Sequence, residues 1–219
     1  ANAPHELSGI LVAPEWWGLS EHAKKSAERL AEAGYAALAM DLYGDAQLTD
    51  EASVASANMT ALLEAPEKLN ERTRLALETL QAQSEVNALN IGAIGFCFGG
   101  RVVLDMARRG VPLKAVASFH GLLETATPAA EGMVKGELLL ATGGKDPLVP
   151  PEVLETFTAE MDKAKANYHI DTYPDARHGF TNPQATANGI KNQFDALHYD
   201  EAAAKTSWQN MLNLLERTL

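Results

Sequence analysis

Three residues of the 219-residue sequence have the types and the chain order that nucleophilic catalysis needs: Cys97, Asp146 and His178. Cys97 is the only cysteine, and it stands between two glycines in Gly95-Phe96-Cys97-Phe98-Gly99. A cysteine attacks as its thiolate, a histidine takes and returns the proton, and a carboxylate orients the histidine. These residue types, in this order, predict covalent catalysis through a cysteine.

The surroundings of the cysteine predict a tight turn from a strand into a helix. Residues 91–96 form an apolar run that is typical of a buried strand, and an amphipathic stretch follows the cysteine. Glycines two residues to either side let neighbouring backbone approach, and the helix N-terminus favours the thiolate. The five residues alone would fit a buried structural cysteine equally well, but the strand–turn–helix context favours a functional one.

Asp146 and His178 each follow a predicted strand. Asp146 comes after residues 137–142, and His178 comes after residues 168–173. Taken alone, Asp146 is interpreted as a turn residue and His178 as a histidine of a surface loop. Because the carboxyl ends of parallel strands meet at one edge of a sheet, the ordered set favours an active site.

The remaining pattern indicates an α/β fold with a mostly parallel, doubly wound sheet and helices on both faces. No repeat or linker divides the chain, so we expect a single domain over residues 1–219. The segment 41–65 is less regular and is expected to hold a short helix as well as part of a pocket wall. The predicted strands are residues 9–13, 35–40, 91–96, 114–119, 137–142 and 168–173, and the last two are polar enough to lie near an edge.

Composition excludes several classes of protein. The hydrophobic content of 46% is globular, and 29 acidic against 18 basic residues give a net charge of −11, which repels nucleic acid and anionic membranes. The sequence lacks an apolar run of ~20 residues and an export signal, so we expect a cytoplasmic protein. It also lacks a pair of histidines spaced as metal ligands, so no metal is expected. The sequence does not indicate an oligomeric state.

Over nearly its whole length the chain resembles the dienelactone hydrolase family of α/β-hydrolases. The resemblance is carried by the motifs GILVAPEWWG, AGYAALAMDLYG, GFCFGG, GGKDPLVP and RHGF. It implies that Cys97 is the nucleophile, His178 the base and Asp146 the residue that orients the base. It also implies that Glu15 holds the resting thiol and moves away as substrate binds. The leading antiparallel strands of the family are expected to be reduced or absent.

Further residues are expected to bind substrate. The backbone N–H groups of Phe98 and Trp16 are predicted to form an oxyanion hole. Among the side chains near the catalytic loops, His120 is interpreted either as a substrate contact or as a strand-end histidine satisfied by backbone. The predicted substrate contacts are Trp17, His120, Phe180 and Arg177.

The distribution of cations bears on the substrate. Family members that act on dienelactone hold its carboxylate with two arginines, but this chain has no lysine or arginine between Arg29 and Lys68 or between His178 and Lys191. We therefore expect cleavage of neutral aryl esters or lactones through a Cys97 thioester, without a cofactor. One alternative is a promiscuous phosphotriesterase that uses the same residues on neutral aryl phosphotriesters. A second is a catalytically inactive binding protein of the same fold.

Overall fold

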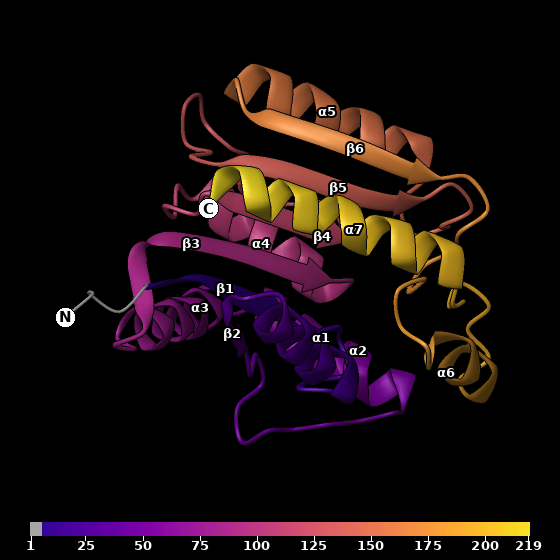
Figure 1. Ribbon diagram of the computed structural model, residues 1–219. Coiled ribbons are helices and arrows are strands. Elements are labelled where there is room, and N and C mark those ends of the chain that lie inside the picture. Colours follow the sequence, from indigo (N-terminus) through magenta and orange to yellow (C-terminus); the bar gives the residue numbers. More distant parts are fainter. Residues whose placement is uncertain (1–5) are drawn as a thin grey trace.

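The computed structural model describes residues 6–219, which form a six-stranded sheet between two layers of helices (Figure 1). All strand pairings in this sheet are parallel, and the strand order is β2-β1-β3-β4-β5-β6. The predicted α/β-hydrolase-like fold with a doubly wound parallel sheet is therefore confirmed. The strands are β1 (Leu7–Ala13), β2 (Ala36–Ala39), β3 (Val86–Phe96), β4 (Ala115–Phe119), β5 (Glu137–Gly143) and β6 (Asn167–Tyr173).

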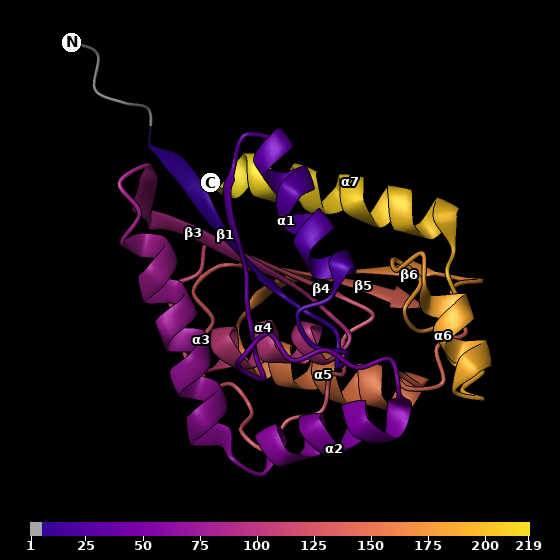
Figure 2. The ribbon, with the colours of Figure 1, turned by 90° about the horizontal axis from the view of Figure 1, so that it is seen from below.

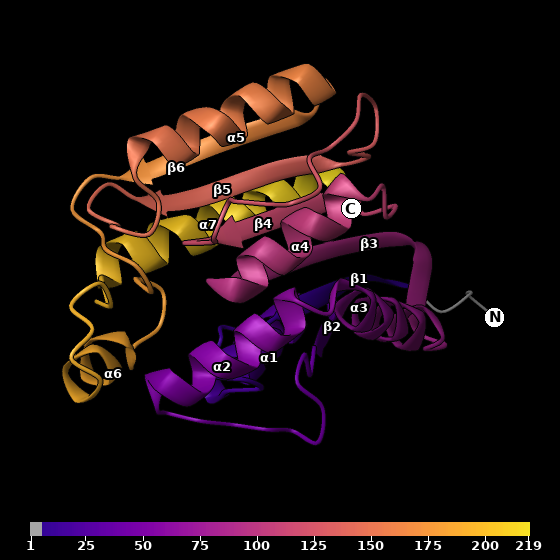
Figure 3. The same cartoon turned by 180° about the vertical axis from the view of Figure 1, so that it is seen from behind.

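The helices cover both faces of the sheet. Figure 2 shows α1 and α7 on one face and α3, α4 and α5 on the other, with α2 outermost on that second side. Figure 3, seen from behind, shows the second face. The helices are α1 (Glu21–Glu32), α2 (Ala52–Leu63), α3 (Pro66–Gln81), α4 (Phe98–Arg108), α5 (Pro151–Ala164), α6 (Ala185–Lys191) and α7 (Glu201–Thr218).

Each face of the sheet has its own apolar core. Ile10, Val12 and Ile94 pack with α1 and α7, whereas Leu11, Ala13 and Ala93 pack with the helices of the other face. Successive residues of β1 and β3 thus serve opposite cores. This explains why residues 9–13 of β1 and 91–96 of β3 are continuous apolar runs rather than alternating ones.

The order of the strands places a crevice at one point of the sheet. The chain runs from β1 to β2 on one side and then returns to β3 on the other side of β1. Ligands of open α/β sheets bind outside the carboxyl ends of the strands at such a reversal. Glu15 follows β1 and Cys97 follows β3, so this topology brings these two segments together.

The predicted polar strands lie on one side of the sheet. β6 is an edge strand as expected, and β5 is its inner neighbour. The opposite edge is β2, a short apolar strand with four half-buried residues. Within residues 6–219, no helix has both the length and the apolar character that a membrane crossing requires.

Candidate active site

Cys97 occupies a strained turn between β3 and α4. Its φ of 53° and ψ of −115° place a residue with a side chain in a region that favours glycine. A Cβ on Gly95 would lie 2.1 Å from the carbonyl oxygen of Gly99, and one on Gly99 would lie 2.3 Å from that of Ala13. The two flanking positions must therefore be glycine, as the sequence predicts. The cysteine side chain is buried but lines a pocket.

His178 and Asp146 form a buried pair next to the cysteine. The Nδ1 atom of His178 lies 2.8 Å from Oδ2 of Asp146, and the other oxygen of this carboxylate accepts a hydrogen bond from the N–H of Leu148 at 2.8 Å. Burial lowers the pKa of His178, but the charges of Cys97 and Asp146 outweigh burial and raise that pKa to about 10. His178 therefore holds its proton beside the cysteine, an arrangement that stabilises a thiolate.

Glu15 is a buried carboxylate whose partner is neutral. The side chain is 3% exposed, and its Oε2 accepts a 2.5 Å hydrogen bond from the Nδ2 of Asn182. Burial raises the pKa of Glu15 to about 7, although the Asn182 hydrogen bond and the charge of His178 act in the opposite direction. No lysine or arginine of residues 6–219 forms an ion pair with this carboxylate. Sequence reasoning missed Asn182, whose only signal was its place four residues after His178.

Two residues next to Cys97 have backbone N–H groups without an acceptor within residues 6–219: Trp16 lines the same pocket, and Phe98 follows Cys97 in the chain. The N–H groups of Trp16 and Phe98 donate to no acceptor among the described residues, as an oxyanion hole requires. The phenol of Tyr43 donates to the carbonyl oxygen of Trp16 at 2.9 Å, and its ring stacks on Phe98 at 6.4 Å. Burial, and then the charge of Cys97, raises the pKa of Tyr43, so its phenol stays protonated and can donate. Tyr43, also missed from the sequence, thus contacts both residues whose N–H groups are the predicted donors.

The pocket at Cys97 is small and apolar. It has a volume of about 200 Å³, and its lining contains no lysine, arginine, aspartate or glutamate. Met59 reaches it from α2, so the irregular segment does supply a short helix and a part of the pocket wall. The lining residues are Trp16, Met59, Cys97, Leu122, Leu148, His178, Phe194 and Leu197.

The structure does not bring the four predicted substrate contacts to this pocket. Phe180 and His120 are fully buried, and Phe180 packs against Tyr173 in the core. Arg177 donates to the carboxylate of Asp195 at 2.7 Å and to its carbonyl oxygen at 2.8 Å, at the surface. Trp17 lines a different cavity. His120 binds Thr181, Arg177 binds Asp195, and Trp17 shares its cavity with Asn182, so these partners lie well away in the sequence and spacing along the chain does not reveal them.

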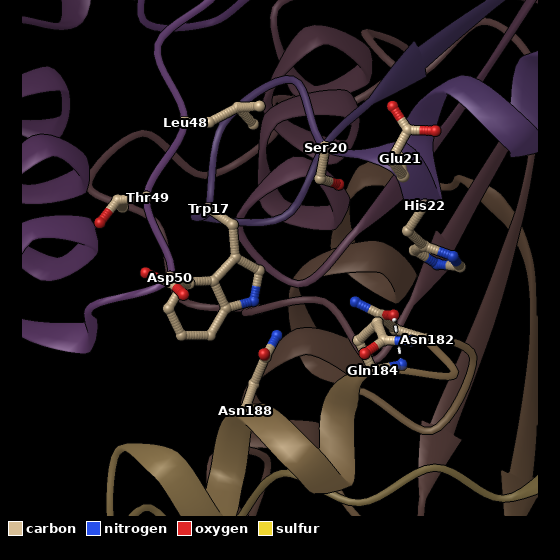
Figure 4. A pocket seen from close by; sticks show the side chains of 10 residues that line it. All are labelled: Trp17, Ser20, Glu21, His22, Leu48, Thr49, Asp50, Asn182, Gln184 and Asn188. Atoms are coloured by element: carbon tan, nitrogen blue, oxygen red, sulfur yellow. Dashed lines mark hydrogen bonds between the residues drawn. The ribbon is translucent and has the colours of Figure 1, made fainter.

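The cavity at Trp17 has a volume of about 370 Å³, and Asn182 is one of its lining residues. Figure 4 shows the Trp17 indole facing Asn182, Gln184 and Asn188, with a hydrogen bond between Asn182 and Gln184. It shares no residue with the pocket at Cys97. Asn182 therefore lines this cavity and also binds the buried Glu15.

Comparison with known proteins agrees with this geometry. The model of the dienelactone hydrolase family matches residues 1–219. The chain belongs to the dienelactone hydrolase family. It is 37% identical to a dienelactone hydrolase-like promiscuous phosphotriesterase from metagenomic libraries, with a TM-score of 0.90 and coverage of 99% of this chain and 88% of the other.

Two sequence relatives carry provisional names of lactone hydrolases. This dienelactone hydrolase family member is 29% identical to a provisionally named carboxymethylenebutenolidase of Salmonella typhimurium, over 94% of this chain and 76% of the other. It is 28% identical to a provisionally named 2-oxo-3-(5-oxofuran-2-ylidene)propanoate lactonase of Bradyrhizobium sp., over 94% of this chain and 82% of the other. The chain is a hydrolase of a family that acts on small-molecule lactones and esters.

Proposed function

We propose that this hydrolase cleaves neutral, activated esters or lactones through a thioester on Cys97. The observation that carries the proposal is the pocket beside Cys97 and His178, whose lining holds no lysine or arginine. A thiolate next to a protonated histidine is suited to attack an acyl carbon, and an apolar pocket is suited to an uncharged substrate.

The proposed chemistry has two halves. The Cys97 thiolate attacks the carbonyl carbon, and the negative oxygen of the tetrahedral intermediate accepts hydrogen bonds from the N–H groups of Trp16 and Phe98. The intermediate collapses to a thioester, and His178 gives its proton to the leaving alkoxide. Water then attacks the thioester while His178 takes a proton from it, and collapse of the second intermediate releases the acid and restores the thiolate.

Glu15 is proposed to act before this cycle begins. By resemblance to the family it holds the resting thiol and moves away as substrate binds. In this structure its carboxylate accepts a hydrogen bond from Asn182, and no hydrogen bond joins it to Cys97 among the described residues, which supports a position away from the thiol. We therefore propose that Asn182 receives Glu15 when His178 is free to serve Cys97.

The charge of the substrate follows from the lining of the pocket. A carboxylated lactone would lose its water in this pocket without a lysine or arginine to pair with, because the proton of His178 already serves Cys97 and Asp146, and burial of an unpaired carboxylate is costly. A neutral aryl group instead contacts Trp16 and Phe194, and an aromatic pair adds about 0.5–1.5 kcal/mol beyond the area it buries. Neutral aryl esters are the expected class.

The likeness to a promiscuous phosphotriesterase favours a second candidate activity. A neutral aryl phosphotriester has the same flat, uncharged leaving group, and its phosphoryl oxygen could use the same two N–H donors. We propose this activity as the alternative reaction of the same site.

The test uses the single cysteine of the chain. With p-nitrophenyl acetate, the wild type should release a burst of nitrophenol equal to the enzyme concentration, and mass spectrometry should find the acetyl group on Cys97. Cys97→Ala should lose the burst and the turnover while its thermal unfolding stays near that of the wild type. A near-normal rate in Cys97→Ala would refute the nucleophile, and a wild type without turnover on esters, lactones or phosphotriesters would favour an inactive binding protein.

A further inference from the structure

A threonine hydroxyl bridges two histidine rings behind the catalytic pair. The Oγ1 of Thr181 lies 2.8 Å from Nε2 of His120 and 3.2 Å from Nε2 of His22. Burial lowers the pKa of His22 to about 4 and, together with the charges of His178 and His22, lowers that of His120 well below its usual value. Both rings are therefore neutral at physiological pH, and each carries one N–H.

The bridge determines which nitrogen of His120 carries the proton. The Nδ1 of His120 is buried and has no hydrogen-bond partner among the described residues. A proton on that nitrogen would be a buried donor without an acceptor, which costs about 1–3 kcal/mol. A proton on Nε2 instead donates to Thr181, whose own hydroxyl can donate to His22. These contacts favour the Nε2–H tautomer of His120.

His120 packs directly against the catalytic histidine. The two ring centroids lie 5.2 Å apart, edge to face at 67°. Asp146 restrains the Nδ1 side of His178, and the charge of Cys97 acts on the same ring. The ring contact with His120 adds to these two interactions and further limits the rotation of His178.

We propose that Thr181 is a positioning residue that anchors His120 as its Nε2–H tautomer, and that His120 in turn holds the His178 ring toward Cys97. This inference rests on the proposed function only in taking Cys97 and His178 as the reacting pair. His120 thus acts on the reaction by positioning His178, and not by contact with the substrate. The charged or titratable groups that face the two rings are Cys97, Asp146 and Glu15 at His178, and His22 at His120.

Two substitutions of Thr181 separate the effect of its hydroxyl group from the effect of the side chain's shape. Thr181→Val keeps the shape and removes the hydroxyl, whereas Thr181→Ser keeps the hydroxyl and removes the methyl group. The readout is the rate of Cys97 alkylation by iodoacetamide as a function of pH. In Thr181→Val, His120 loses its anchor, and His178 should then move away from the thiolate. The pH of half-maximal alkylation should therefore rise by about 0.5. This rise is smaller than the change of about 1–3 in pKa that a neighbouring full charge produces. Thr181→Ser should stay at the wild-type midpoint.

A remote threonine provides the matched control. Thr73 is buried on α3, and its hydroxyl donates to the carbonyl oxygen of Asn70 at 3.0 Å. Thr73→Val should lower stability without moving the midpoint. If Thr181→Val lowers stability but keeps the midpoint, or if Thr181→Ser moves it equally, the positioning role is refuted.

The tautomer of His120 can be measured directly on the wild-type protein. Long-range ¹H–¹⁵N correlation spectra distinguish the two neutral tautomers of a histidine, and we expect His120 to carry its proton on Nε2. A proton on Nδ1 would overturn the inference whether or not Cys97 is the nucleophile. Conversely, retained activity in Cys97→Ala would refute the proposed function and leave the tautomer result unaffected.

Discussion

Asn182 donates a 2.5 Å hydrogen bond to Glu15, a buried carboxylate 167 positions earlier in the chain. The loop after β6 supplies the amide, and the loop after β1 supplies the carboxylate. An amide donates a hydrogen bond but brings no net charge, so it offsets the burial of a carboxylate less than a guanidinium would. Glu15 is consequently a carboxyl group that changes its charge near neutral pH.

Glu15→Gln should stabilise the protein at alkaline pH. Folding raises the pKa of Glu15 from 4.5 to about 7, so the folded state binds the proton more tightly and stability falls as the pH rises through this window. The penalty is complete above pH ~7 and amounts to about 3 kcal/mol. Urea unfolding at pH 8 should therefore show Glu15→Gln more stable than the wild type by up to that amount, with little difference near pH 4.

The exposed Glu28 of α1 provides the control, because Glu28→Gln removes an equal charge from the surface. It should change stability by less than about 0.5 kcal/mol at either pH. An equal change in the free energy of unfolding by Glu15→Gln at pH 4 and pH 8 would contradict the inference that Glu15 carries a buried charge at alkaline pH.

Asn182→Leu should move the titration of Glu15 upward. Leucine has a similar shape but cannot donate to the carboxylate, and a hydrogen bond to a charged group is worth about 1.5–3 kcal/mol. The pKa of Glu15, followed by carboxyl ¹³C NMR, should rise by about 1 or more. Asn188→Leu, in the adjacent cavity and without a hydrogen bond to Glu15, should leave it unchanged. Equal titrations in both variants would mean that Asn182 does not set the charge of Glu15.

Tyr43→Phe should slow the chemistry more than it weakens substrate binding. The variant loses the hydrogen bond to the carbonyl oxygen of Trp16, whose own N–H is a proposed oxyanion donor. Removal of a whole donor lowers kcat by about 10²–10³, so a loosened donor should lower it by about tenfold at nearly constant KM. Tyr168→Phe, which removes a remote phenol bound to Asp162, should leave kcat unchanged. A rise in KM at constant kcat would place Tyr43 in binding alone.

A cation placed in the pocket should change its charge preference. Met59→Arg puts a guanidinium at the end of a lining residue, and Met59→Leu controls for the loss of the thioether. The ratio of kcat/KM for a carboxylated lactone to that for a neutral aryl ester should rise about tenfold in Met59→Arg only, since a charged hydrogen bond contributes roughly 1.5–3 kcal/mol.

Arg177→Ala should leave this ratio unchanged, because Arg177 is paired with Asp195 at the surface. If the wild type prefers the carboxylated lactone and Arg177→Ala abolishes that preference, Arg177 reaches the pocket and the proposed neutral substrate class is wrong.

Local patterns predicted most of the elements but not all. The strand before Cys97 and the helix after it follow from an apolar run, a glycine-flanked turn and helical periodicity. The helix α6 was not predicted, because it is seven residues long and buries only Ala185 and Gly189, so its pattern is weak. The helix α2 carries no charge and has no clear polar face, which left its segment ambiguous.

The sequence by itself determined the turn at Cys97 and the chain order of Asp146 and His178. These features depend on residue type and local backbone, and steric exclusion of a Cβ acts over a few residues. Only the tertiary structure decided the partners of Glu15, His120, Arg177 and Trp17. Each of these side chains packs against segments far away in the chain, and the free energy of a buried polar group depends on which donor or acceptor the fold brings to it.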